Sequence, residues 1–150
     1  MQEHMLSTCT LLILDIDDFK TVNDSVGHLT GDMLLRTIGD VLTESFRSTD
    51  IVGRFGGDEF VVLVRDAADQ TLMEEKCRLL QQRIRNATAA VCTFPVTCSI
   101  GGALADRRYV TFDSMFQQAD AAMYQAKSSG KDHFVLLPYR SAANFRPNFE

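Results

Sequence analysis

Residues 10–16 (TLLILDI) form a short apolar run, and this run constrains the fold more than any other part of the sequence. It shows no helical period, and its length and its leucine and isoleucine content favour a strand buried inside a sheet. Its C-terminal end leads into a group of acids, Asp15, Asp17 and Asp18. Several carboxylates are therefore expected at one end of a buried strand.

Helical patterns recur along the rest of the chain. Apolar side chains at helical spacing, together with helix-stop signals, predict helices over residues 19–27, 31–46, 69–86 and 111–127. Thr30 or Asp32 is a candidate cap for the second helix, and Gly130 is expected to end the last one.

Strands are predicted in the remaining apolar segments. Residues 51–55 and 59–64 flank Gly56-Gly57-Asp58, which favours a hairpin because glycine adopts the positive φ that a tight turn requires. Residues 95–104 alternate between apolar and polar side chains, which predicts a half-buried strand ended by Gly101-Gly102. Residues 133–137 form the last predicted strand.

The predicted order of elements is β-α-α-β-β-α-β-α-β. It indicates an α/β fold of the α+β type, with a single mixed sheet of about five strands flanked by helices. Residues 1–137 are expected to form this one domain. Residues 138–150 contain two prolines and no clear period, so they are expected to form a loose or loosely docked C-terminal tail.

Charge and cysteine content exclude some classes of function. The formal net charge is −5, which argues against nucleic acid as a partner, although a bound metal can still bridge acidic side chains to small anionic ligands. The four cysteines show no CxxC spacing, and no signal peptide precedes them, which favours reduced thiols in a cytoplasmic protein. The longest apolar runs are far below the roughly 20 residues that span a bilayer.

The acids occur in two elements, and their arrangement is the strongest indication of a chemical function in the sequence. Asp15 to Asp18 end the buried strand, and Asp58 and Glu59 lie at the hairpin tip. If these strands are neighbours, the carboxylates converge, and a divalent cation would relieve their mutual repulsion. Solvated strand ends and turn-forming acids explain the same residues equally well, and the two interpretations stay open at this point.

Two further groups have both a binding and an ordinary structural interpretation. Asn23 and Asp32, near Lys20, offer the donors and acceptors that complement a guanine edge, but each is also a common turn or cap residue. Lys127 and Lys131 could hold phosphates, or they could complement a helix dipole.

Arg47 and Asp50, three residues apart, could clamp a planar anionic ligand. Surface pairs of this kind are also common without any ligand, and they usually contribute little to stability.

Four motifs resemble the GGDEF family of diguanylate cyclases, and together they occur in the order typical of that family. They are GGDEF at residues 56–60, LDIDDFKTVNDSVGHLTGD at 14–32, SIGGA at 99–103 and DAAMYQAKSSGKD at 120–132. The resemblance extends from about residue 11 to residue 135. It implies that two GTP molecules condense to cyclic di-GMP with loss of two pyrophosphates. Each of two facing domains holds one GTP, and the 3′-hydroxyl of one attacks the α-phosphorus of the other.

The resemblance also implies a metal site that uses Mg²⁺, with Mn²⁺ as a substitute. Its ligands are expected to be Asp15, Asp58 and the Ile16 carbonyl. Glu59 is expected either to be a second metal ligand or to assist deprotonation of the attacking hydroxyl. Asp15, Asp58 and Glu59 are thus the candidate catalytic residues.

The remaining residues are implied to bind the nucleotide. Asn23 and Asp32 match the guanine readers. The phosphate contacts are Lys20, Lys127 and Lys131, with the backbone N–H groups of Asp18 and Phe19. Gly56 and Gly57 would let the hairpin backbone approach the nucleotide closely.

Regulation and partners are implied in the same way. Arg47 and Asp50 match the family's RxxD site, where the product binds and inhibits, and Arg78 is a candidate second arginine there. Only nine residues precede Thr10, so the usual N-terminal helix segment is expected to be missing, along with a sensor or dimerising domain. The chain is expected in the cytoplasm, on its own or as part of a larger membrane-bound sensor.

Two functions follow. The first is a diguanylate cyclase active as a homodimer. The second is a catalytically weak or inactive module that binds GTP or cyclic di-GMP as a receptor. A nucleotide cyclase acting on a single ATP or GTP is a more remote third alternative.

Overall fold

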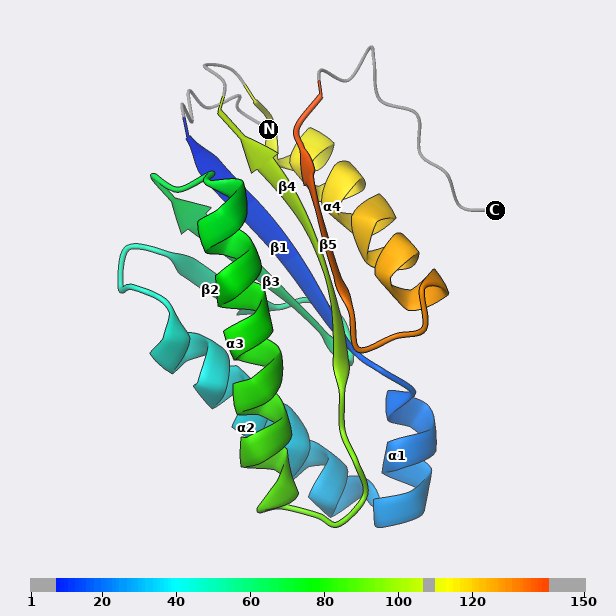
Figure 1. Cartoon of the computed structure of the whole chain (residues 1–150). Coiled ribbons are helices and arrows are strands. Elements are labelled where there is room, and N and C mark those ends of the chain that lie inside the picture. Colours follow the sequence, from blue (N-terminus) through cyan, green and yellow to red (C-terminus); the bar gives the residue numbers. More distant parts are fainter. Residues whose placement is uncertain (1–7, 107–109, 141–150) are drawn as a thin grey trace.

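A computed structural model describes residues 8–106 and 110–140. Its centre is one sheet with the strand order β2-β3-β1-β4-β5 (Figure 1). The strands are β1 (Cys9–Ile16), β2 (Ile51–Arg54), β3 (Glu59–Arg65), β4 (Cys98–Ala105) and β5 (Phe134–Pro138). β4 and β5 are parallel, and every other neighbouring pair is antiparallel. The predicted mixed sheet of five strands is confirmed, with the first predicted strand at its centre.

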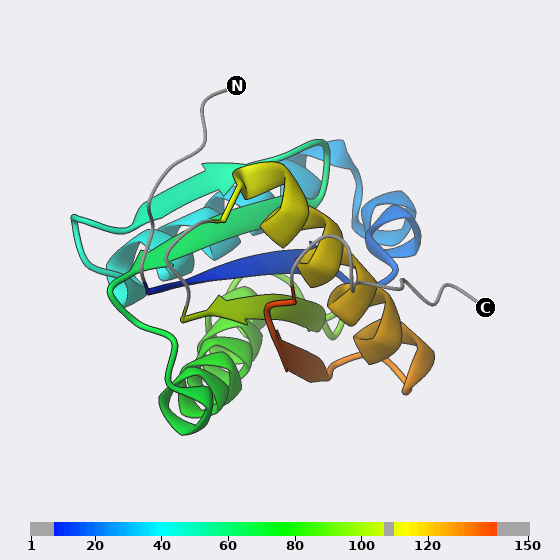
Figure 2. The same ribbon diagram turned by 90° about the horizontal axis from the view of Figure 1, so that it is seen from above.

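Helices cover both faces of this sheet. They are α1 (Phe19–Val26), α2 (His28–Ser45), α3 (Gln70–Ala89) and α4 (Phe112–Ser128). Figures 1 and 2 show α3 and α4 on opposite sides of β1. Among the helices within the described residues, none is long and apolar enough to cross a membrane.

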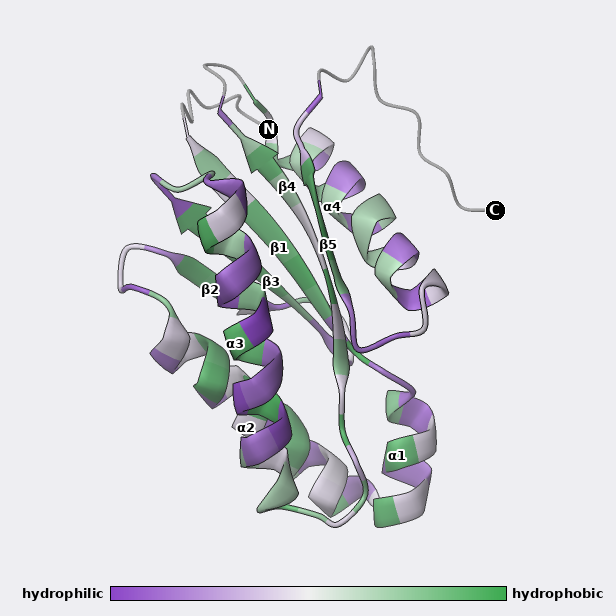
Figure 3. Cartoon of the chain, in the orientation of Figure 1, coloured by the Kyte–Doolittle hydropathy of each residue, from purple (hydrophilic) through white to green (hydrophobic). Residues whose placement is uncertain are grey.

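Alternation along β1 builds two hydrophobic cores. Leu12 and Leu14 pack with α2 and α3, and Leu11 and Ile13 pack with α4. Because successive strand side chains point to opposite faces, an apolar run supplies both cores at once. Figure 3 shows the inner strands as mostly hydrophobic, whereas the helices also carry hydrophilic residues.

Strand β4 begins at Cys98 instead of residue 95, and it differs from its prediction in two further ways. All eight of its residues are buried, and the strand continues through Gly101 and Gly102 instead of ending there. A Cβ atom on Gly101 would lie 2.1 Å from the Met123 nitrogen and 2.3 Å from the Ala119 oxygen. The glycine therefore lets the backbone of α4 pack directly on the strand, and its role is close packing, not chain reversal.

The ends of the helices also differ in places. α2 begins at His28, after Gly27 with φ 88°, so neither Thr30 nor Asp32 is its cap. α3 continues to Ala89, three residues beyond its predicted end. α4 ends at Ser128, and Gly130 follows with φ 118°, as predicted for a helix stop.

The first residues of the predicted tail are part of the fold. Pro138 belongs to β5. The Tyr139 hydroxyl donates to Ser114 Oγ (2.9 Å), and the Arg140 N–H donates to Gln118 Oε1 (2.9 Å), so both residues are fastened to α4. Residues 141–150 lie outside the described part of the chain.

The four cysteines are free thiols, and three of them are buried. Burial raises the pKa of the Cys9 thiol to about 11 and that of the Cys77 thiol to about 12. These side chains therefore behave as small apolar core residues.

Candidate active site

The two acidic elements meet at one end of the sheet. β1 and β3 are antiparallel neighbours, and Asp15 lies opposite Glu59 in their register. The Ile16 N–H donates to the Asp58 carbonyl oxygen (3.2 Å), which fixes the hairpin turn to the end of β1. The condition that the sequence left open, that the two strands are neighbours, is met.

Asp15 is the acid of β1 that faces α4. Its Oδ2 forms an ion pair with Lys127 Nζ of α4 at 2.5 Å, with the two side chains 14% and 30% exposed. Its Oδ1 is buried and is the one such side-chain atom in residues 8–106 and 110–140 that has no hydrogen-bond partner. Burial raises the pKa of Asp15, Asp58 adds to that rise, and Lys127 opposes it.

Negative charge exceeds positive charge around Glu59. Burial raises the pKa of Glu59, and the charges of Asp15, Asp120 and Asp58 raise it further, while Lys127 lowers it. Asp120, whose own pKa is raised by burial, was not singled out from the sequence. Its spacing of seven residues before Lys127 places both on one face of α4, and this spacing is the signal that could have identified it.

The donor set fits a hard divalent cation. Two or three carboxylates, a buried unpaired carboxylate oxygen and the nearby Ile16 carbonyl are ligands that such cations prefer. No group of three or more His, Cys, Asp or Glu side chains is already gathered for a metal among the described residues. A cation here would therefore complete its shell with water or phosphate oxygens, as Mg²⁺ usually does.

A second lysine lies at the same end of the sheet. Lys131 Nζ contacts Asp18 Oδ1 at 2.7 Å, and this hydrogen bond raises the pKa of Lys131. Asp18 immediately precedes α1, and Phe19 begins it, so their N–H groups belong to the helix N-terminus, where donors lack intrahelical partners. Lys20 is exposed on the first turn of α1.

The two predicted guanine readers lie near each other in space. Asn23 is half-buried on α1, and its Nδ2 lies 3.0 Å from His28 Nδ1. A Cβ atom on Gly31 would lie only 1.9 Å from Asn23 Oδ1, so Asn23 packs directly on the residue before Asp32. Asp32 is exposed and lines a cavity of about 590 Å³ between α2 and β2.

The hairpin between β2 and β3 is held by hydrogen bonds among its own residues. Gly56 has φ 80°, a conformation that favours glycine. The Phe55 N–H donates to the Glu59 oxygen (2.7 Å), and Arg54 Nε donates to the Gly57 oxygen (3.1 Å). A Cβ atom added to Gly56 or to Gly57 would meet no atom of the described residues within 4 Å, so this turn is open on its outer side.

Arg47 and Asp50 form a separate site at the opposite end of β3. Asp50 Oδ2 accepts from the Arg47 N–H (3.0 Å), and Oδ1 accepts from the Arg65 N–H (3.0 Å) and from the Arg47 guanidinium (3.2 Å). Burial alone would raise the pKa of Asp50, but these hydrogen bonds hold it below its usual value. The pair thus joins the α2–β2 connection to the end of β3.

The structure does not bring Arg78 to this pair. Its guanidinium lies over the Phe134 ring, 5.5 Å from the ring centroid. The second basic residue that lines a cavity of about 460 Å³ with Arg47 and Asp50 is Lys76, which no sequence motif indicated.

Asp50→Asn is expected to lower the free energy of unfolding by about 1–3 kcal/mol at neutral pH, because its amide would face a backbone N–H that needs an acceptor. The pKa of Asp50 is lowered in the folded chain, so its stabilisation is complete above the ordinary value of about 3.9 and is lost as the pH falls through the lower folded-state value. Urea unfolding at pH 7 and pH 3 should therefore show a difference from wild type that shrinks in acid. Asp24→Asn, at an exposed position on α1, is the control. An equal difference at both pH values would contradict this account.

A family model and individual relatives with known names were found to be similar to this chain, and they agree with one another. The family model described as diguanylate cyclase, GGDEF domain, matches residues 1–133. The diguanylate cyclase DgcS of Shewanella oneidensis is 41% identical over 132 residues, covering 86% of this chain and 42% of DgcS. The diguanylate cyclase DgcP of Pseudomonas aeruginosa is 41% identical over 133 residues, covering 84% of this chain and 19% of DgcP.

A solved structure shows the same fold. The GGDEF domain of DgcB from Caulobacter crescentus, in complex with c-di-GMP, matches with a TM-score of 0.76 at 27% identity, covering 86% of this chain and 77% of that one. The chain spans less than half the length of either curated relative, DgcS or DgcP.

Proposed function

The chain belongs to the diguanylate cyclase GGDEF family, and we propose that it condenses two GTP molecules into cyclic di-GMP and two pyrophosphates. The observation that carries this proposal is the register that sets Asp15 opposite Glu59 and beside the turn residue Asp58, together with the buried, unpaired Oδ1 of Asp15 and Lys127 next to it. A solvated strand end would not bury such an oxygen, because burial of an unpaired polar atom is unfavourable.

Asp15, Asp58 and the Ile16 carbonyl would hold Mg²⁺, and Mn²⁺ could replace it. When bound, the ion polarises the phosphates, lowers the pKa of the attacking hydroxyl and stabilises the leaving pyrophosphate. Glu59 is either a further ligand or the group that receives the proton of the 3′-hydroxyl. Lys127 and Lys131 balance the charge of the triphosphate from α4 and the loop after it, and Lys20 does so from α1.

Each of the two condensation steps forms a bond from the 3′-oxygen of one nucleotide to the α-phosphorus of the other and breaks the bond from that phosphorus to the pyrophosphate oxygen, so that two pyrophosphates leave. One domain binds one GTP, so the attacking hydroxyl comes from a second copy, and we propose a homodimer as the active form. A sensor or dimerising domain would bring the copies together in the cytoplasm, where reduced thiols such as these persist.

The test is direct. Purified protein is incubated with GTP and Mg²⁺ at several protein concentrations, and the nucleotides are separated by chromatography with mass detection. Cyclic di-GMP that rises more steeply than protein concentration supports an enzyme assembled from two half-sites. A folded protein that makes no product at any concentration would overturn the cyclase proposal.

Product binding is the second part of the proposal. Arg47 and Asp50 line a cavity about 460 Å³ in volume at the end of β3 away from the acids, so a ligand there need not compete with GTP. We propose that cyclic di-GMP binds there and inhibits the enzyme, or, in a chain without turnover, makes it a receptor. Calorimetric titration with cyclic di-GMP should show that Arg47→Ala weakens binding while Asp58→Ala does not.

Gly31→Ala is expected to impair guanine recognition without unfolding the chain. The added Cβ would displace the Asn23 carboxamide, which is a flexible side chain, so affinity for guanosine 5′-monophosphate should fall about tenfold, the cost of one lost hydrogen bond to a buried partner. Replacing a helical glycine by alanine raises helix propensity, so the free energy of unfolding should not fall by much. Titration and urea unfolding of the same variant check both results. Unchanged affinity would remove Asn23 from the guanine site.

A further inference from the structure

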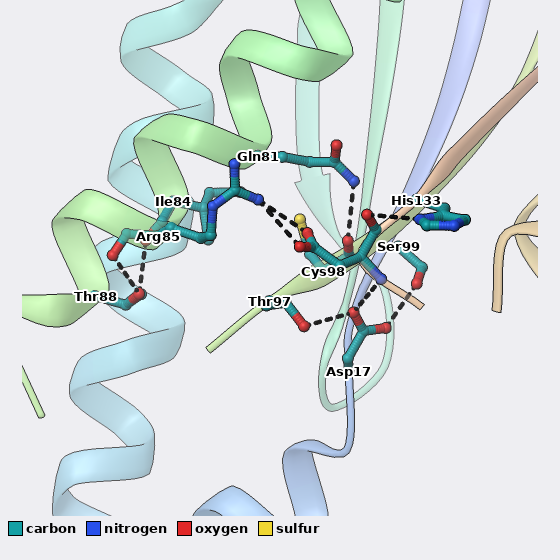
Figure 4. Close-up of polar contacts among 10 residues, drawn as sticks. Asp17, Gln81, Ile84, Arg85, Thr88, Thr97, Cys98, Ser99 and His133 are labelled. Carbon is teal, nitrogen blue, oxygen red and sulfur yellow. Dashed lines mark hydrogen bonds and ion pairs between the residues drawn. The ribbon is translucent and has the colours of Figure 1, made fainter. Parts of the chain in front are cut away.

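Asp17 is a buried carboxylate for which the proposed function has no direct use. It is 5% exposed and lies immediately after β1. Its Oδ1 accepts from Ser99 Oγ (2.6 Å), and its Oδ2 accepts from Thr97 Oγ1 (2.8 Å) and from the Asp132 N–H (2.9 Å). Figure 4 shows the side chains of Thr97 and Ser99 turned toward Asp17. Both oxygens are thus occupied by this chain's own donors.

The third donor, the Asp132 N–H, lies next in sequence to Lys131, a proposed phosphate contact. Asp132 directly follows Lys131 in the loop between α4 and β5. The residues Gly130, Lys131 and Asp132 have φ angles of 118°, 64° and 49°. Such left-handed conformations are unfavourable for a lysine, so the loop keeps this shape only where other contacts fix it.

Besides the Lys131–Asp18 ion pair, three hydrogen bonds hold residues 131 and 132 of the loop. The Lys131 N–H donates to the Ala126 oxygen (3.3 Å) at the end of α4. The Asp132 side chain accepts from Arg85 of α3 (3.0 Å), on the exposed side. The hydrogen bond from the Asp132 N–H to Asp17 is the inner one and the only one of the three that leads to the end of β1.

We propose that Asp17 is a positioning residue, whose buried carboxylate holds the α4–β5 loop so that the Lys131 amine lies beside Asp18 at the end of β1. Asp17 would act on the triphosphate only through Lys131. The expected effect on triphosphate binding therefore rests on the proposed function. The distance of 2.7 Å between Lys131 Nζ and Asp18 Oδ1 places the amine at the N-terminus of α1, where phosphate oxygens are expected.

Two substitutions of Asp17 differ in the hydrogen bonds that they can keep. Asp17→Ala removes all three bonds. Asp17→Asn can keep them, with its oxygen accepting from Thr97 and Asp132 and its amide donating to Ser99 Oγ, because a hydroxyl accepts as well as donates. Asp17→Asn is therefore the conservative variant, and Asp24→Ala, which removes an exposed carboxylate of α1, is the matched control.

The first measurement follows the loop without any nucleotide. Hydrogen exchange of the Asp132 amide, read by NMR in the full chain, is expected to be at least about tenfold faster in Asp17→Ala than in wild type, and close to wild type in Asp17→Asn and Asp24→Ala. Unchanged protection of this amide in Asp17→Ala would overturn the proposal. If Asp17→Ala does not fold, Thr97→Val, which removes one of the two donors to Oδ2, is measured in its place with the same expected direction.

The second measurement links the loop to the triphosphate. The probes are the α,β-methylene analogue of GTP, which cannot release pyrophosphate by the normal reaction, and guanosine 5′-monophosphate, each with Mg²⁺. Asp17→Ala is expected to weaken the triphosphate analogue about tenfold and to leave the monophosphate unchanged. In a Lys131→Ala background, Asp17→Ala should add little, because the residue through which it acts is gone.

The outcomes separate the two proposals. Equal weakening of both nucleotides, or full additivity with Lys131→Ala, would show general damage to the fold and overturn the positioning role. Wild-type protein that binds neither nucleotide would overturn the proposed function, while the amide exchange would still decide whether Asp17 holds the loop.

Discussion

Replacing Asp58 by alanine is expected to lower the rate of cyclic di-GMP formation about a thousandfold, since a divalent ion at the reacting phosphates contributes several kcal/mol of transition-state stabilisation. Asp58 lies in the hairpin turn, and its backbone oxygen, which the substitution keeps, accepts the hydrogen bond from the Ile16 N–H. The variant should therefore fold as wild type does. Product is measured by chromatography at saturating GTP and Mg²⁺.

Two controls define this result. Asp24→Ala removes an exposed carboxylate from α1 and should leave the rate unchanged. Guanosine 5′-monophosphate should still bind to Asp58→Ala, because Asn23 and Asp32 lie on the helices and not on the hairpin. An Asp58→Ala protein with full activity would show that this carboxylate does not hold the metal.

Gly101→Ala is expected to have the largest effect on stability, a loss of about 3 kcal/mol or more, which is at the upper end for an overpacked core. The added Cβ would meet the Met123 nitrogen at 2.1 Å and the Ala119 oxygen at 2.3 Å, and both belong to the backbone of a helix. Neither atom can move by a change of rotamer, so α4 as a whole must shift away from β4. Urea unfolding followed by circular dichroism measures the change.

Gly53→Ala is the matched control for this prediction. Gly53 is also a strand glycine, but no atom of the described part of the chain lies within 4 Å of the position that its Cβ would take. Its free energy of unfolding should stay within about 1 kcal/mol of wild type. If both variants lost the same stability, close packing of α4 on β4 would not be the reason for the glycine at 101.

Local patterns predicted those parts of the molecule whose cause is local. The run from residue 10 to residue 16 is apolar on both faces, and it is the central strand because such a strand must be covered on both sides. The hairpin was predicted from Gly56-Gly57-Asp58 for a similar reason, and Gly56 has the positive φ that a tight turn needs. Both features depend on fewer than ten consecutive residues.

The parts that the sequence did not predict depend on contacts across the fold. Gly101 has the pattern of a turn glycine, and only the position of α4 shows that it is a packing glycine. Asp17 is one of three acids at the end of the first predicted strand, and no local sequence pattern distinguishes it from Asp15 or Asp18. Its donors come from Thr97 and Ser99, some 80 residues away, and from Asp132. Arg78 is a candidate second arginine for the Arg47–Asp50 site in the sequence, whereas its guanidinium lies over the Phe134 ring in the structure.

The contacts of Asp17 also bear on how β1 finds its place between β3 and β4. A strand that is apolar on both faces can slip by one residue and still bury hydrophobic side chains on each side, so hydrophobic burial alone leaves its alignment poorly specified. With β1 displaced by one residue, Asp17 would lose the hydroxyls of Thr97 and Ser99 and become a buried carboxylate without donors, which is strongly unfavourable. The polar end of β1 therefore selects the one alignment with β4 in which Asp15 lies opposite Ser99, so that pairing of these two strands and burial of the Asp17 carboxylate among its donors become a single event during folding.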